Sequence, residues 1–421
     1  MLRTGVIADD FTGATDIASA YVRRGHRAVV VTGPSAVEPD GRHDVVVVAL
    51  KSRTAPVERA VADSLAALDA LVAAGCERFV FKYCSTFDST DTGNIGPVLD
   101  ALADRLGAER SVVVPSFPGN GRTVYQGHLF VGADLLEHSP MRHHPLTPMT
   151  RSRIVEILAP QTAGAIAEVH LDVVRSGSRS DAPGTDLRTA IDAADGRWIV
   201  VDAVSDDDLV AIAEATADHV LVSGAAGLAL GVPSGTADPG DVVRDVDGRR
   251  LVVCGSASAR TREQIAHAVA AGLPTRRLDP ARSAAAPDDV VAETVDWVAE
   301  QYRTDPDAVP VVYTVGDLAD VDRSADTDAL ERVLARIVDE AVGRLGTASV
   351  VVAGGETSGA VVSGLGVDRL DIGPAIAPGV CWSRAEPRGS TTGAPHPIAL
   401  ALKSGNFASP DMFTTAWEAA R

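Results

Sequence analysis

Two adjacent carboxylates near the N-terminus are the first residues whose chemistry stands out. Asp9 and Asp10 directly follow the apolar run Thr4–Ala8, and Thr12 and Gly13 then lead into a segment of helical spacing. Adjacent side chains diverge in direction, so one carboxylate can cap the helix while the other holds a metal ion or accepts a hydroxyl proton. Two ordinary helix caps are the alternative. The compact Asp-Asp-x-Thr-Gly-Ala sequence favours a catalytic role for Asp9 and Asp10.

A second polar cluster lies between residues 82 and 94. An apolar run ends at Lys82, about a dozen mostly polar residues follow, and a helix is expected from near Ile95. This density of donors and acceptors suits a polyhydroxylated, negatively charged small molecule, with Lys82 for its carboxylate; a plain polar loop is the alternative. The predicted substrate-binding residues here are Lys82, Ser85, Thr86, Ser89 and Asn94, with Asp88 as a further catalytic candidate.

A glycine-rich turn follows the next apolar run. Arg122 lies on this turn and is a natural clamp for a carboxylate, so we predict that it also binds the substrate. Further on, His143 and His144 are adjacent in a proline-flanked loop and lack the spacing of a metal-ligand set. No protein ligands for a resident metal ion are therefore assigned.

Three turns in the second half of the chain suit phosphate. Each has an apolar run that breaks into small residues: at Gly255, at Gly354 and at Gly405. Small residues allow backbone N–H groups and the positive end of a helix to approach a phosphate. None of the turns has the GxxxxGK[ST] or GxGxxG pattern, but together they indicate a nucleotide site.

Lysine is scarce in this chain. Three of its 38 basic residues are lysines: Lys51, Lys82 and Lys403. Where arginine has replaced lysine almost everywhere, a remaining lysine marks a place that needs an ammonium group. Lys82 shares its segment with Asn94, and Lys403 with Asn406, although asparagine is equally rare. Chance is the alternative, and the clustering favours function.

The elements that position these residues alternate between β-branched runs and Ala/Leu-rich helical segments, which is typical of an α/β fold with mostly parallel sheets. Predicted strands are Thr4–Ala8, Ala28–Thr32, Asp44–Leu50, Arg78–Lys82, Ser111–Pro115, Leu251–Cys254, Val309–Val315 and Ser349–Ala353, and predicted helices are Val57–Ala74, Gly96–Leu106 and Ala259–Ala271. Residues 231–250 read as a linker and 175–186 as a polar loop. We therefore predict two α/β domains, residues 1–235 and 245–421, with an active-site cleft between them.

Composition excludes several classes of protein. The 421 residues carry a net charge of −19 without an acidic tail, which argues against nucleic acid or a membrane surface as the main partner. Apolar runs are too short to span a bilayer, and Asp9 interrupts any secretory signal. The four cysteines are far apart with no CxxC pair, which indicates a reducing, cytoplasmic location without disulfides or zinc.

The motifs resemble those of the four-carbon acid sugar kinase family, ATP-dependent enzymes with an N-terminal sugar-binding domain and a C-terminal nucleotide-binding domain. The resemblance covers essentially the whole chain and rests on residues 7–14 (Ile-Ala-Asp-Asp-Phe-Thr-Gly-Ala), 353–359 (Ala-Gly-Gly-Glu-Thr-Ser-Gly) and 403–413 (Lys-Ser-Gly-Asn-Phe-Ala-Ser-Pro-Asp-Met-Phe). Threonate and erythronate kinases usually carry Lys-x-x-Asp-Ser-x-x-Arg-Gly-Asn as the second motif. Residues 82–94 and 141–149 instead resemble the 3-oxo-tetronate kinase branch, which phosphorylates the C4 hydroxyl of 3-dehydrotetronates.

This resemblance implies the site residues of the second domain and the cofactors, ATP with Mg²⁺. The implied nucleotide contacts are Ser256 or Ser258, then Gly354, Gly355, Glu356 and Thr357, and Gly405. Sugar-acid contacts are implied in the first two motifs. Phosphoryl transfer depends mostly on positioning and charge stabilisation, with Asp9 or Asp10 as general base or magnesium contact and Asp88 as the alternative.

Other functions are less consistent with the sequence. A ligand-sensing binding protein would need a visible coupling module such as a basic helix-turn-helix, and an NAD-linked dehydrogenase would need the missing GxGxxG. Within the kinase interpretation, the runner-up is a kinase for D-threonate or D-erythronate. The expected partner is a small sugar acid, with no nucleic acid and no membrane, and the protein is expected to form a homodimer.

Overall fold

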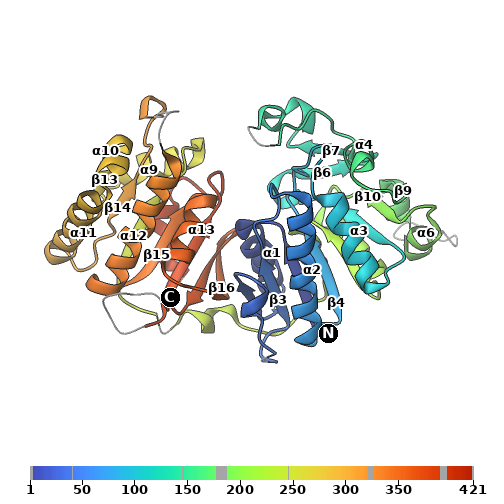
Figure 1. Cartoon of the computed structure of the whole chain (residues 1–421), viewed down its shortest axis with the longest axis horizontal. Helices are drawn as coiled ribbons and strands as arrows, with labels where there is room; N and C mark the ends of the chain where they lie inside the picture. Colours follow the sequence, from blue (N-terminus) through green and yellow to red (C-terminus); the bar gives the residue numbers. More distant parts are fainter. Residues whose placement is uncertain are drawn as a thin grey trace. The chain divides into compact units, whose positions relative to one another are not determined.

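The computed structural model describes residues 3–39, 41–144, 147–176, 187–244, 246–320, 326–388 and 396–419. The chain divides into two compact units, residues 1–237 and 238–421 (Figure 1). Each unit contains a mostly parallel sheet with helices, which confirms the predicted α/β class. Most of the polar loop predicted at 175–186, and two residues of the 141–149 motif, lie outside the described residues.

The first unit is organised around eight parallel strands in the order β2-β3-β1-β4-β11-β5-β10-β9. The central strands are runs of valine and other apolar residues, as expected for strands covered on both faces. A small antiparallel sheet, β6-β7-β8, carries the turn with Arg122. The strands are β1 (Thr4–Ala8), β2 (Ala28–Val31), β3 (Val45–Ala49), β4 (Arg78–Lys82), β5 (Ser111–Val114), β6 (Arg122–Tyr125), β7 (His128–Val131), β8 (Asp134–Leu135), β9 (Ile166–Val169), β10 (Trp198–Val201) and β11 (Leu221–Gly224).

Helices of the first unit bury their apolar faces against this sheet. Figure 1 shows α2 and α3 running side by side along it, and α1 packs against β2, β3 and α8. The helices are α1 (Phe11–Arg23), α2 (Val57–Ala73), α3 (Ile95–Leu106), α4 (Ile154–Leu158), α5 (Leu171–Val174), α6 (Leu187–Ala193), α7 (Asp206–Ala215) and α8 (Gly227–Leu230). The predicted helices Val57–Ala74 and Gly96–Leu106 agree with α2 and α3 to within one residue.

The second unit has the strand order β13-β14-β12-β15-β18-β17-β16, parallel as far as β18 and antiparallel beyond it. Its strands are β12 (Arg249–Cys254), β13 (Thr275–Arg277), β14 (Val311–Tyr313), β15 (Thr347–Ala353), β16 (Arg369–Ala377), β17 (Val380–Ala385) and β18 (Ile398–Lys403). Its helices are α9 (Ala259–Ala270), α10 (Pro280–Ala285), α11 (Pro287–Thr304), α12 (Thr327–Leu345), α13 (Gly355–Gly364) and α14 (Met412–Thr415).

The expected linker, residues 231–250, is not a uniformly exposed segment. Val232 is buried near its start, and Val243 is buried in the core of the second unit. The last two residues of the segment, Arg249 and Arg250, begin β12. Across the described residues, no helix is both long enough and apolar enough to cross a membrane.

Strand order determines which motifs meet. Strands β3, β1 and β4 are neighbours, so the residues after Ala8, Ala49 and Lys82 share one edge of the first sheet. In the second unit β12, β15 and β18 are neighbours in the same way, which brings the three glycine turns together.

Candidate active site

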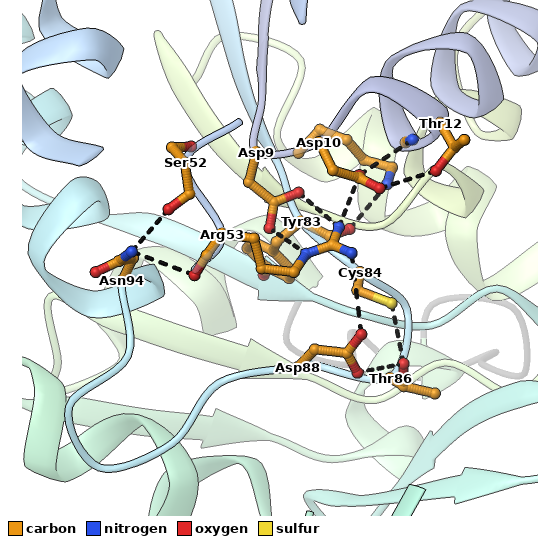
Figure 2. Close-up of polar contacts among 12 residues, drawn as sticks. Asp9, Asp10, Thr12, Ser52, Arg53, Tyr83, Cys84, Thr86, Asp88 and Asn94 are labelled. Atoms are coloured by element: carbon orange, nitrogen blue, oxygen red, sulfur yellow. Dashed lines mark hydrogen bonds and ion pairs between the residues drawn. The ribbon is translucent and has the colours of Figure 1, made fainter. Parts of the chain in front are cut away.

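Arg53 is the centre of the polar cluster at the edge of the first sheet (Figure 2). Its Nε and Nη2 donate to the two carboxylate oxygens of Asp9 at 2.9 and 2.8 Å, and Nη2 also contacts Asp10 Oδ1 at 2.7 Å. Its Nη1 lies 4.0 Å from Asp88 Oδ2. One guanidinium therefore neutralises three predicted catalytic carboxylates in part, and it binds two of them directly.

Asp9 and Asp10 differ in environment although they are adjacent. Asp9 is buried, and burial raises the pKa of its carboxyl against the opposing charge of Arg53. Asp10 caps α1 by accepting from Gly13 N at 3.1 Å and from Thr12 Oγ1 at 2.9 Å. Burial opposes ionisation of Asp10 too, but Arg53, Lys82 and these hydrogen bonds outweigh it and lower its pKa. The divergence predicted for this pair is present, with Asp10 as the cap.

Lys82 is a buried ammonium without an ion pair. Its Nζ donates to the backbone oxygen of Tyr83 at 2.9 Å, and no carboxylate of the described residues lies within ion-pair distance of it. A Cβ at Gly13 would lie 2.9 Å from Lys82 Nζ and 2.2 Å from Asp10 Oδ1. Glycine is thus required there, because any side chain would displace the ammonium group or the helix cap.

The loop after β4 holds Asp88 by local contacts. Thr86 Oγ1 donates to Asp88 Oδ1 at 2.6 Å, and Cys84 Sγ lies 2.9 Å from Thr86 Oγ1. Phe87, between them in sequence, is fully buried and has a φ of +52°. A non-glycine residue in this left-handed conformation costs about 1–3 kcal/mol, which packing must offset. The buried ring thus fixes the path of the loop.

The remaining predicted substrate residues are more dispersed. Asn94 donates from Nδ2 to the backbone oxygens of Ser52 at 2.7 Å and Ala55 at 2.8 Å, so its nitrogen holds the loop that carries Arg53. Ser89 donates to Gln161 Oε1 at 2.9 Å, away from the Arg53 cluster. Ser85 is half-buried on the loop after β4. Arg122 starts β6, and its buried Nε has no partner.

The three glycine turns of the second unit converge on Lys403. The ammonium group donates to Thr261 Oγ1 at 3.1 Å and to Gly405 O at 3.0 Å. Ser258 caps α9, and a Cβ at Gly405 would lie 2.3 Å from Ser256 Oγ.

The β15–α13 turn joins this group through a backbone bond from Gly354 N to Lys403 O at 3.0 Å. A Cβ at Gly354 would lie 2.7 Å from Thr357 Oγ1. Gly355 and Glu356 are the first two residues of α13, and both are exposed. All the predicted nucleotide contacts therefore lie on turns that meet at one edge of the second sheet.

Lys403 carries its charge in the interior of the second unit. It is fully buried, it has no carboxylate partner among the described residues, and burial lowers its pKa to about 8. Such a group is unfavourable unless an anion compensates for it. Ser256, Ser258, the turn amides and this ammonium together form a cradle suited to phosphate.

Two residues of the first unit were missed by the sequence analysis. Arg53 follows the strand-like run Asp44–Leu50 as Asp9 follows its own run, so the same end-of-strand argument could have found it. Asp16 is an ionisable residue within the otherwise largely apolar helix α1, and its Oδ1 is buried without a partner. An isolated charge in an apolar helix was the available signal.

Comparison with known proteins decides the family. Curated relatives from Cupriavidus necator and Burkholderia multivorans, both named 3-oxo-tetronate kinase, are 45% and 44% identical over 98% and 99% of this chain and 96% of their own. Residues 4–232 match a sugar-binding N-terminal domain, and residues 251–413 match a nucleotide-binding C-terminal domain. The chain belongs to the four-carbon acid sugar kinase family. The resemblance predicted from the motifs is therefore confirmed.

Solved structures of the family agree with this assignment. One from Salmonella typhimurium LT2 has a TM-score of 0.85 at 36% identity and covers 99% of each chain. One from Haemophilus influenzae has a TM-score of 0.79 at 36% identity, covering 99% of this chain and 100% of its own. The kinase family assignment thus has support from sequence and from fold.

Proposed function

We propose that this member of the family is an ATP-dependent kinase that transfers the γ-phosphoryl group to the C4 hydroxyl of a 3-oxo-tetronate. The observation that carries the proposal is the pair of buried, unpaired lysines. Lys82 lies in the unit that matches a sugar-binding domain, and Lys403 lies in the unit that matches a nucleotide-binding domain. Each would be compensated by an anion of one substrate: the sugar-acid carboxylate and the nucleotide phosphates. The curated relatives' name supports this choice of sugar acid.

The acceptor side is proposed to work by charge and position. Lys82 and Arg122 hold the carboxylate of the sugar acid. Asp10 has a lowered pKa and contributes negative charge, while Asp9 orients Arg53. Asp88 is the best-placed acceptor for the hydroxyl proton, since its nearest guanidinium nitrogen is 4.0 Å away, against 2.7–2.9 Å for the other two.

The donor side is proposed to be the cradle around Lys403. Backbone N–H groups at the start of α9 and α13 would donate to the phosphates, and Lys403 would supply a point charge. In the described residues, no group of three or more His, Cys, Asp or Glu side chains is arranged to hold a metal ion. Mg²⁺ would arrive on the nucleotide, where it would neutralise phosphate charge, and Glu356, exposed at the start of α13, is the residue proposed to contact it.

The first test is coupled ADP release with Mg-ATP and a panel of sugar acids. The panel contains D- and L-3-dehydrotetronates, D-threonate and D-erythronate. Turnover on a 3-oxo acid alone is the expected result and would also settle its stereoisomer. Turnover on the reduced acids alone would contradict the proposed substrate and retain the kinase chemistry. ATP binding without turnover on any of the four would contradict the substrate class.

Three further expectations remain predictions. They are the domain boundaries at 1–235 and 245–421 with a cleft between the domains, the homodimer, and the cytoplasmic location. Size-exclusion chromatography with light scattering would test the homodimer.

A further inference from the structure

Asp16, on α1, is a carboxylate near the Arg53 cluster that the proposed mechanism does not use. Within the described residues its side chain forms no hydrogen bond and no ion pair, and its Oδ1 is buried. The three carboxylates of the Arg53 cluster already have donors: Asp9 and Asp10 have Arg53, and Asp88 has Thr86. A buried carboxylate oxygen without a donor costs free energy, so its retention calls for a donor that the chain itself does not supply.

The position of Asp16 on α1 brings it to the substrate-binding side of the cluster. It lies three residues after Gly13 and four after Thr12, on the same helix face. Residues so spaced have Cβ atoms about 5–6 Å apart. The Cβ position of Gly13 is 2.9 Å from Lys82 Nζ, and the Asp16 carboxyl, on the next turn of the helix, lies within electrostatic range of the same ammonium group.

The charges around Asp16 are those proposed to hold the sugar acid. Lys82, Asp10, Arg122 and Arg23 lie within electrostatic range of its carboxyl. Burial raises its pKa to about 6, with Asp10 adding to the rise and the three cations opposing it. Arg122 Nε is also buried without a partner. One region therefore contains a carboxylate oxygen without a donor (Asp16), a guanidinium N–H without an acceptor (Arg122) and an ammonium group without an ion pair (Lys82).

We propose that the Asp16 carboxylate accepts a hydrogen bond from the C2 hydroxyl of the sugar acid and so selects 2-hydroxy acids. The inference rests on the proposed function, in which Lys82 and Arg122 hold the C1 carboxylate. The hydroxyl on the adjacent carbon then faces the carboxylate beside those two cations. The C4 hydroxyl, two carbons further along, remains available for phosphoryl transfer. Asp16 thereby becomes a specificity-determining residue for the end of the substrate that does not react.

The test compares two substrates on matched variants. 3-Oxo-tetronate carries the C2 hydroxyl, and freshly prepared 4-hydroxy-3-oxobutanoate lacks it but keeps the C4 hydroxyl. The unmodified chain should prefer the first in kcat/KM by about 10- to 100-fold, the range for a hydrogen bond to a charged group. In Asp16→Ala this preference should fall to within about 3-fold, because the loss should affect the C2-hydroxyl substrate alone. Asp63→Ala, on α2, is the control and should keep the full preference.

A second readout excludes a merely structural role. Below about pH 6 the Asp16 carboxyl gains a proton, so kcat/KM for 3-oxo-tetronate should fall toward acid with an apparent pKa near that value. This decrease of kcat/KM toward acid pH should be absent with 4-hydroxy-3-oxobutanoate as substrate, and it should be absent in Asp16→Asn with either substrate. These comparisons need only soluble, active variants, and alanine and asparagine are no larger than the aspartate that they replace on this helix.

The outcomes separate this inference from the proposed function. If the unmodified chain phosphorylates 3-oxo-tetronate but Asp16→Ala keeps its preference for it, the C2 hydroxyl is bound elsewhere and the role of Asp16 is refuted. Equal kcat/KM for both substrates on the unmodified chain would refute it as well. Failure of the unmodified chain to phosphorylate 3-oxo-tetronate at all would overturn the proposed function and this inference together.

Discussion

Removal of the Arg53 guanidinium should destabilise the chain in a way that depends on pH. In Arg53→Ala, Asp9 stays buried but loses both of its charged donors, and Asp10 loses one. Breaking a buried ion pair costs about 3–5 kcal/mol. Because the Arg53 side chain is 22% exposed, some water screens the loss, and we expect about 2–3 kcal/mol at neutral pH.

That free energy can be converted into a melting temperature. For a unit of this size, 1 kcal/mol shifts Tm by roughly 2–4 °C, so Arg53→Ala should melt about 4–12 °C lower. Arg53→Lys should recover part of the loss, because one ammonium group keeps the charge but cannot span Asp9 and Asp10 as the guanidinium does. Arg59→Ala is the control, since Arg59 is 75% exposed in a pair with Asp63 and its loss should change Tm little.

The stability loss of Arg53→Ala should grow as pH rises, because removal of Arg53 changes the pKa values of Asp9 and Asp10. With Arg53 present, the pKa of Asp10 is lowered, so that carboxylate contributes stability above its unfolded pKa, and the contribution is lost as pH falls. Without Arg53, burial dominates, and the pKa values of Asp9 and Asp10 both rise. The folded variant then holds protons that the unfolded chain has released, and its stability decreases as pH rises through this range. The deficit of Arg53→Ala should therefore be small near about pH 4.5 and largest near about pH 7.5.

Differential scanning calorimetry of the three variants and the unmodified chain at both pH values is the assay. A deficit no larger than that of Arg59→Ala, or one that is equal at the two pH values, would refute the reasoning.

Four further variants test single contacts. Gly13→Ala places a Cβ 2.2 Å from Asp10 Oδ1, so it should lower Tm by a few degrees and raise the sugar-acid KM, while Gly119→Ala, where the nearest atom is 3.8 Å away, should do neither. Lys403→Ala should raise the KM for ATP about 10- to 100-fold, and Lys51→Ala, at an exposed lysine, is the control. The affinity of the unmodified chain for ADP should fall as pH rises through about 8, where the Lys403 ammonium loses its charge. This fall should be absent from Lys403→Arg. Asp88→Asn should lower kcat by about 10²-fold, and near-normal turnover would remove Asp88 from proton transfer, with the exposed Asp91→Asn as control. Lys82→Ala should raise the KM for the sugar acid, and a change confined to the KM for ATP would contradict its assignment.

The sequence was most informative where a buried strand ends. Short apolar runs predicted β1, β3, β4 and β15, and the rule that ligands lie beyond the carboxyl ends of parallel strands pointed to Asp9, Lys82 and Gly354. The scarcity of lysine singled out Lys82 and Lys403, and both are buried without an ion pair. These inferences depend on the local pattern of apolar residues and on overall composition, and both can be read from a single sequence.

Contacts between distant segments were beyond that reach. Arg53 binds Asp9 across 44 residues because β3 pairs with β1, and the strand order is not written in either segment. Asn94 is predicted to bind the substrate, and the sequence did not indicate that its amide nitrogen also holds the loop of Arg53. The sequence did not single out Asp16, because its nearness to Lys82 arises only in the folded chain.

The distribution of the three lysines also makes the chain suitable for selective labelling of one lysine. Lys51 is exposed, whereas Lys82 and Lys403 are enclosed by the fold. An amine-reactive fluorophore applied under native conditions should therefore attach to the lysines of this chain at Lys51 almost alone. That residue is two positions from Arg53, on the loop that links β3 to α2. A dye on Lys51 would report on the acceptor side of the enzyme without any engineered cysteine, and labelling of Lys82 or Lys403 would appear only as the chain unfolds.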